Sequence, residues 1–372
     1  MALFFASDLP YATWGIHIPT IRERFSLSDA TLSLAMFAVA GGAILAMGPV
    51  GRWVVQVGTA RAVRLAAWPF SLAIGTLMLP PSFATLLPLL LAFSIANASY
   101  DVAMNAQAAT VEAAHGRPIM SSLHGMFSMG GMVGALAGGG LISLGVSPWL
   151  HCAAVGLFVL LATRLGFPHL LPEAPPTVTT SAEHAHHAGR RLWWIGGLAF
   201  LGLVGEGAMY DWTSVYMRDV ALSPAALAAA GYAAFSGGMA LGRFGGDWLR
   251  IRFGARALLT GSGWTGFIGV ALALLLPYPL VALLGFTLMG LGAANMVPLF
   301  FVAASRLDGV PPAEGITAVS RLAYVGMLLG PVLIGALAHA TDSLRIGLAL
   351  VALAIGLIAV CGVRFLPAET AR

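Results

Sequence analysis

The sequence contains no lysine, and charged residues of any kind are scarce. Its 19 basic residues are all arginine. Charged side chains make up 9% of the 372 residues, against about a quarter in an average soluble domain. Hydrophobic residues make up 59%, and the mean hydropathy is +0.88. This composition excludes an ordinary soluble globular protein and indicates a chain that crosses a lipid bilayer several times.

Other features are missing as well, and each absence excludes a class of function. The two cysteines, Cys152 and Cys361, lie in apolar runs without a CxxC spacing, so we expect neither a disulfide framework nor a metal site. The arginines form no basic stripe or arm, which argues against nucleic-acid binding. A P-loop sequence is absent, which argues against an ATP-driven pump. The sequence has no pattern of a nucleophile with a neighbouring base, so nothing indicates an enzyme. We also expect no cofactor.

Apolar runs of about 20 residues, the length that crosses the hydrocarbon core, recur between polar, Pro or Gly breaks. We count twelve and therefore expect an all-α membrane protein with twelve transmembrane helices in two pseudo-symmetric six-helix bundles. The expected spans are 2–20, 29–51, 60–79, 84–110, 118–144, 148–168, 191–216, 224–249, 255–276, 279–305, 312–338 and 343–366. Residues 169–190 are expected to be a cytoplasmic linker between an N-terminal bundle (1–168) and a C-terminal bundle (191–372), because this polar, Pro-rich stretch cannot fold alone.

The arginines of the inter-helix loops indicate the orientation of the chain. If the N-terminus is cytoplasmic, most of them fall on the cytoplasmic side, as the positive-inside rule requires, and both termini are cytoplasmic. The cytoplasmic arginines would be Arg52, Arg61, Arg64, Arg117, Arg190, Arg191, Arg250, Arg252, Arg256 and Arg306. Those on the outer side would be Arg22, Arg24, Arg218 and Arg345.

Short motifs repeat between the two halves of the chain at an offset of 195 positions. The pairs are LSDATL (27–32) with LSPAAL (222–227), GRW (51–53) with GDW (246–248), and, more roughly, GMVG (131–134) with GMLLG (326–330). One offset held over such distances indicates that the second half is a duplicate of the first.

Two six-helix halves joined by a linker resemble the major facilitator superfamily, whose halves are parallel repeats. The stretch GRFGGDWLRIRFGAR (242–256) resembles its loop signature, with Asp247, Arg250 and Arg252 as gating-loop residues. DVAMNAQ, GRPIMSSLHGMFSMGG, EGAMYDW and VSRLAYVGMLLGP are similar to the fucose-permease-like branch and, within it, to YbjJ-type bacterial inner-membrane proteins. The resemblance implies a multi-pass transporter of the bacterial inner membrane that works by alternating access.

Ionisable and amide side chains inside the expected spans are the candidate site. A charge at mid-depth costs above about 2.5 kcal/mol, so it should face the protein interior. Asp101 and Arg321 each lie nine residues from an expected cytoplasmic end, about 13 Å deep, and we expect both to line one hydrated cleft. Proton-coupling candidates are Asp101, Glu206 and Asp8. Substrate-binding candidates are Asn105, His124, Tyr210, Asp211, Asn295, Arg321 and Tyr324.

The resemblance adds roles to two of these positions. The fourth-helix glutamate of fucose permease binds protons, and Asp101 matches it. The first-helix aspartate of that protein aligns with Gly15, so Asp8 or Glu206 would have to replace it. Asp101 and Arg321 can equally form a structural pair. His124, Asn105 and Asn295 can simply hydrogen-bond between helices.

The sequence therefore predicts a monomeric, proton-coupled secondary transporter of a small polar molecule, with a sugar-like substrate favoured. Its partners would be this substrate, protons and the lipid bilayer. Two alternatives stay open: an exporter of hydrophobic or amphipathic compounds, and a membrane sensor that binds a solute without moving it.

Overall fold

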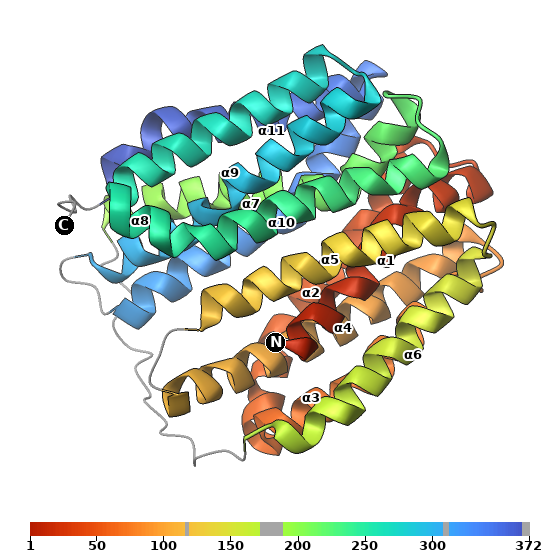
Figure 1. Ribbon diagram of the computed structural model, residues 1–372, viewed down its shortest axis with the longest axis horizontal. Coiled ribbons are helices and arrows are strands. Elements are labelled where there is room, and N and C mark those ends of the chain that lie inside the picture. The colour runs from red at the N-terminus through yellow and green to blue at the C-terminus, as the bar shows by residue number, and fades with distance from the viewer. Residues whose placement is uncertain (116–118, 172–188, 308–311, 367–372) are drawn as a thin grey trace. The chain divides into compact units, whose positions relative to one another are not determined.

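The computed structural model describes residues 1–115, 119–171, 189–307 and 312–366, and these are almost entirely helical (Figure 1). The helices are α1 (Ala2–Phe25), α2 (Asp29–Val57), α3 (Thr59–Gly75), α4 (Phe83–His115), α5 (Met120–Ser143), α6 (Pro148–Gly166), α7 (Arg190–Asp219), α8 (Ala225–Leu275), α9 (Pro279–Ser305), α10 (Pro312–Thr341) and α11 (Leu344–Cys361). Short 3₁₀ helices follow α6 at Phe167–His169 and α11 at Gly362–Phe365. Most of the expected linker, and Arg117, lie outside the described residues.

Helix α8 contains two of the expected spans. Its backbone leaves the helical conformation at Gly254, with φ 80° and ψ 160°. Gly58 has a similar conformation, φ 89° and ψ 142°, between α2 and α3. The same glycine break thus joins the second and third segments of each half. With α8 counted as two segments, every one of the twelve expected spans falls on a helix.

Nine helices among the described residues are long and apolar enough to cross a membrane, and α8 is counted once among them. Helices α1 and α3 fall outside this set. Helix α3 has 17 residues, and α1 buries polar side chains that include Ser7, Asp8 and Thr13. Several helices also run past the expected spans, α4 as far as His115. Hydropathy marks the stretch inside the lipid, whereas a helix can continue into water.

The described residues divide into two compact units. Unit 1 comprises those of 1–177 and 223–233, and unit 2 those of 178–222 and 234–372. In unit 1, α1 packs on α5 and α6, α2 packs on α4, and α3 packs on α4 and α6 (Figure 1). In unit 2, α7 packs on α9, α10 and α11. Helices α1 and α7 are therefore central in their units.

Glycines bring the same pairs of helices together in the two units. In each pair the glycine leaves no room for a Cβ, or barely enough, beside the central helix. The contacts are Gly130 with Phe5, Gly134 with Leu9, Gly326 with Phe200, and Gly330 with Val204. The duplication seen in the sequence thus extends to the packing. It also corrects the register of two motifs. Gly130 rather than Gly131 corresponds to Gly326, and the breaks at Gly58 and Gly254 place GRW and GDW one position out of register.

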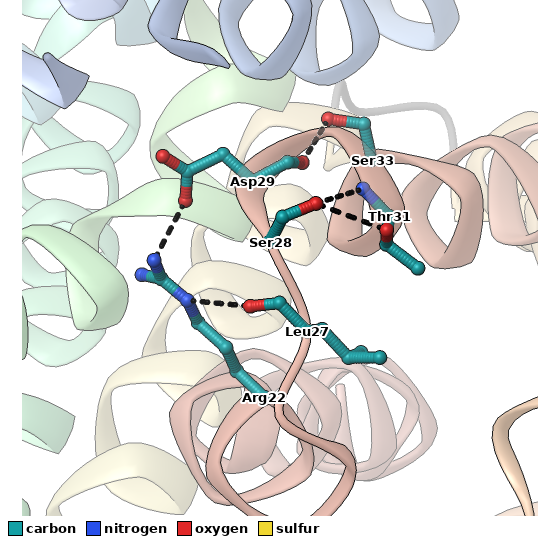
Figure 2. Close-up of polar contacts among 6 residues, drawn as sticks. All are labelled: Arg22, Leu27, Ser28, Asp29, Thr31 and Ser33. Carbon is teal, nitrogen blue, oxygen red and sulfur yellow. Dashed lines mark hydrogen bonds and ion pairs between the residues drawn. The ribbon is translucent and has the colours of Figure 1, made fainter. Parts of the chain in front are cut away.

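The connection between α1 and α2 shows how a short polar sequence starts a helix (Figure 2). Ser26 ends α1 in the left-handed conformation, and the Ser28 hydroxyl accepts a hydrogen bond from the Thr31 amide at 3.2 Å. Arg22 donates to the Leu27 carbonyl at 3.3 Å and lies 3.0 Å from the Asp29 carboxylate. The LSDATL motif is therefore a helix cap, the usual role of Ser and Asp at this position.

Two further arginines of the expected outer side also bind carbonyl groups near helix ends. Arg24 donates to the carbonyls of Met78 at 2.7 Å and Pro80 at 2.9 Å. Arg345 donates to the carbonyl of Leu274 at 2.9 Å. These arginines satisfy backbone groups that a helix end leaves unpaired.

The break at Gly254 leads to a first prediction. Its backbone conformation is one that side chains with a Cβ rarely adopt, so Gly254→Ala should destabilise the protein by about 1–3 kcal/mol. The measurement is the unfolding temperature of the purified protein in detergent. Gly261→Ala is the control, because Gly261 is helical with open space around it and alanine favours helix there. Equal unfolding temperatures for the two variants would contradict the assignment.

Candidate functional site

Among the described residues, the two central helices carry eight of the 19 buried polar side chains, more than any other pair of helices. Nearly every residue of α7 from Gly202 to Met217 is buried, including Glu206 and Asp211. Helix α1 buries Asp8 and His17 completely. Because both helices are enclosed by protein, these side chains face protein groups rather than lipid, as charged groups inside a membrane must.

Asp8 is the most buried carboxylate among the described residues of unit 1. Its Oδ1 accepts a hydrogen bond from the Tyr232 hydroxyl at 3.5 Å. Tyr232 belongs to the first residues of α8, which form part of unit 1 and touch α5 where Gly139 meets Ala226. One turn before Asp8 on α1, Phe4 meets the ring of His124 edge-on, with the ring centroids 5.6 Å apart. Asp8, Tyr232 and His124 therefore lie in one region of unit 1.

Asp101 has a neutral partner on its own helix. The amide nitrogen of Asn105 donates to Asp101 Oδ1 at 2.9 Å and to the Asp101 carbonyl at 3.0 Å. Both side chains are half-buried. Arg321, the expected partner, is an exposed residue of α10 in unit 2. Its pairing with Asp101 stays a prediction.

Glu206 has a partner that the sequence did not suggest. Glu206 on α7 and Arg243 on α8 form an ion pair, with 3.2 Å between Oε1 and the guanidinium. Both side chains are largely buried, with exposed fractions of 11% and 17%. The signal was present, because Arg243 lies well inside an expected span and the depth argument applied to Arg321 applies to it equally.

Asn295 of α9 also contacts α8. Its amide donates to the carbonyl of Gly242, the residue before Arg243, at 3.2 Å. Helix α8 of unit 2 thus contacts a carboxylate of α7 and an amide of α9. The contact ties α9 to α8, so Asn295 at least holds two helices together.

The remaining candidates of unit 2 differ in exposure. Tyr210 is buried, and its ring meets Phe235 edge-on at 5.0 Å. Asp211 is 3% exposed, whereas Tyr324 is 46% exposed. Their roles stay predictions.

The residues of the expected gating loop end the first segment of α8. Asp247 and Arg252 are exposed, and Arg250 is half-buried, just before the break at Gly254. The Arg252 guanidinium lies 5.8 Å from the centre of the Phe253 ring. A gating role for these residues also stays a prediction.

A buried histidine pair was missed by the sequence analysis. His17 Nε2 of α1 lies 3.0 Å from His151 Nδ1 of α6, and the two side chains are 0% and 4% exposed. One ring must donate the hydrogen and the other accept it. Each histidine stands alone in an apolar run, so only the packing of α1 on α6 reveals the pair. Within the described residues, no group of three or more His, Cys, Asp or Glu side chains is placed to hold a metal ion.

Comparison with known proteins identifies the family. Residues 1–313 match the sequence profile of the Major Facilitator Superfamily. The chain belongs to the major facilitator superfamily. The protein is accordingly a membrane transporter of this class, and the expected superfamily and fold are confirmed.

Relatives match almost the whole chain. An uncharacterised MFS-type transporter of Yersinia pestis is 33% identical over 356 residues, which cover 94% of this chain and 90% of the relative. The membrane protein MosC of Rhizobium meliloti is 34% identical over 366 residues, covering 96% and 87%. Membership of the fucose-permease-like branch stays a prediction.

Solved structures show the same fold at low identity. A bacterial homologue of the human lysosomal transporter Spinster superposes with a TM-score of 0.72 at 18% identity, covering 98% of this chain and 94% of the other. A variant of the nucleoside transporter NupG gives 0.73 at 12% identity and covers 98% of both chains.

The ion pair between α7 and α8 leads to a second prediction. Glu206→Gln removes the carboxylate charge that faces the buried Arg243 guanidinium, and Arg243→Gln does the converse, so each change should destabilise the protein by about 3–5 kcal/mol. The double variant should recover part of this loss, because both charges are gone. Unfolding in detergent measures all three, with Arg252→Gln as the control for removing an exposed arginine. Additive losses in the double variant would show that the two side chains act independently.

Proposed function

We propose that this protein is a secondary transporter that moves a small polar solute, preferably sugar-like, by alternating access and couples the movement to protons. The observation that carries the proposal is Asp101, a carboxylate inside a membrane-spanning helix whose partner is the amide of Asn105. Family membership supports transport itself. The identity of the solute and the coupling rest on the side chains.

Polar donors and acceptors on buried helices support a polar solute. Unit 1 offers the Asp8 carboxylate, the Tyr232 hydroxyl and the His124 ring, and unit 2 offers Tyr210 and Asn295. Binding sites for sugar-type molecules combine aromatic faces with a few hydrogen-bonding groups. A transporter of purely hydrophobic compounds would not need so many polar groups, each of which is costly to bury.

The partners of the carboxylates favour Asp101 over Glu206 as the proton carrier. The Arg243 guanidinium beside Glu206 is always charged and stabilises the ionised carboxylate. The Asn105 amide is neutral, and its N–H can donate to an oxygen of Asp101 whether the carboxyl group is ionised or protonated. Asp101 can therefore gain and lose a proton without losing its hydrogen bond. Asp8, with a tyrosine hydroxyl as a partner, is the second candidate.

Identifying a solute comes first, by thermal unfolding of the purified protein with hexoses, polyols, organic acids and amphipathic cations. A compound that binds only the folded state raises the unfolding temperature. We expect hexoses or polyols to do so. Stabilisation by amphipathic cations alone would favour the exporter. A solute that binds but shows no counterflow in proteoliposomes would favour the sensor.

Asp101→Asn should abolish proton coupling while keeping transport, because asparagine cannot titrate. In proteoliposomes carrying a pH-sensitive dye, the wild type should acidify when the identified solute enters, and a pH gradient should drive accumulation. The variant should lose both signals and retain counterflow. Asp342→Asn makes the same chemical change at an exposed loop residue in the left-handed conformation, which asparagine tolerates. Undiminished accumulation by Asp101→Asn would refute the assigned role.

A further inference from the structure

An apolar groove lies among α2, α3 and α4 of unit 1. Its volume is about 300 Å³, and it is open to the surface. The lining residues are Pro49, Val50, Trp53, Leu65, Ala66, Pro69 and Ser99. The one hydroxyl among them, that of Ser99, already donates to the Ile95 carbonyl at 2.7 Å. The groove therefore presents hydrocarbon to an occupant and is at the small end of the size range of ligand sites.

Unit 2 has a larger side chain at the position equivalent to Ser99. The packing glycines Gly130 and Gly326 occupy equivalent positions 196 residues apart. At the same spacing, Asn295 of α9 corresponds to Ser99 of α4. The Asn295 amide reaches the Gly242 carbonyl, and its Oδ1 lies against Gly246 of α8. Ser99 is too short to make the equivalent contacts. Unit 1 thus has an open groove at Ser99, whereas in unit 2 the Asn295 side chain bridges α9 and α8.

Two arginines lie close in sequence to lining residues of this groove, on α2 and α3. Arg52 precedes Trp53 on α2, and Arg61 lies one turn before Leu65 on α3. Both are exposed, and each is within about 9 Å, along its helix, of the turn at Gly58 that joins the two helices. Their long side chains can extend toward the water while the apolar lining lies deeper. Arg64 points elsewhere, with its guanidinium 5.0 Å from the centre of the Phe167 ring.

The exposed face of α3 indicates whether an occupant of the groove comes from the lipid or from water. Leu65, Trp68 and Leu72 follow one another along the helix and are 52%, 61% and 68% exposed. In a membrane-spanning helix such a row faces acyl chains. A molecule that enters the groove from this side is therefore a lipid.

We propose that the groove binds one anionic phospholipid, with an acyl chain along the apolar lining and the phosphate beside Arg52 and Arg61. Basic side chains at the mouth of an apolar groove between helices select negatively charged headgroups over zwitterionic ones. The site is independent of the transport site proposed above, since it shares no residue with it.

Native mass spectrometry of the purified full chain, with phosphatidylglycerol or phosphatidylcholine of identical acyl chains added to the detergent, tests the proposal. We expect the first bound lipid to be phosphatidylglycerol with about tenfold preference. Arg52→Gln with Arg61→Gln should remove the preference while phosphatidylcholine still binds. Ser99→Leu, which fills the groove, should reduce the occupancy of both lipids.

The second unit supplies a matched control. Arg250→Gln with Arg252→Gln removes the same number of arginines beside the corresponding glycine break, at Gly254, where Asn295 takes the place of Ser99. The preference should survive in this variant. Equal binding of the two lipids by the wild type, or an equal loss in the control, would overturn the proposal. So would unchanged occupancy in a Ser99→Leu variant with a normal unfolding temperature. Arg52 and Arg61 are exposed, so their variants test the headgroup preference even if Ser99→Leu fails to fold.

Discussion

Inside a bilayer every backbone N–H and C=O group must find its partner within the protein, and an α-helix satisfies this requirement by itself. Helices in lipid gain little from burying apolar surface against one another, so they approach until side chain and backbone are in close contact. Glycine makes this possible where Gly130 meets the Phe5 carbonyl and Gly326 meets that of Phe200. These contacts determine which helices are neighbours, and the neighbours determine which polar side chains meet.

Inside the bilayer a polar side chain needs a partner within the protein. Three kinds of partner occur in this structure. Glu206 has an opposite charge, Asp101 a neutral amide, and His17 a second imidazole. An opposite charge fixes the charge state of its partner, whereas an amide or an imidazole leaves its partner able to exchange a proton. The partner of a buried acid, more than its depth, therefore decides what chemistry it can perform.

Sequence reasoning located the helices well, because the bilayer imposes both their length and their composition. The span expected at 279–305 coincides with α9, and the two spans within α8 meet close to Gly254. The pairs Glu206 with Arg243 and His17 with His151 could not be predicted in this way. A pairing depends on the direction in which each helix faces and on which helix lies beside it. Polar residues are too few in these apolar helices to indicate either.

The duplicated halves keep their backbone contacts and differ in their polar ones. At equivalent places on the central helices, His17 binds His151 of α6, whereas Trp212 donates to the Pro331 carbonyl of α10 at 3.0 Å. At another pair of equivalent places, Ser99 lines a groove, whereas Asn295 donates to the Gly242 carbonyl of α8. A change at a glycine contact would separate two helices, so those positions are constrained in both units. The polar positions can diverge without loss of the fold, and the functions of the two units can therefore differ there.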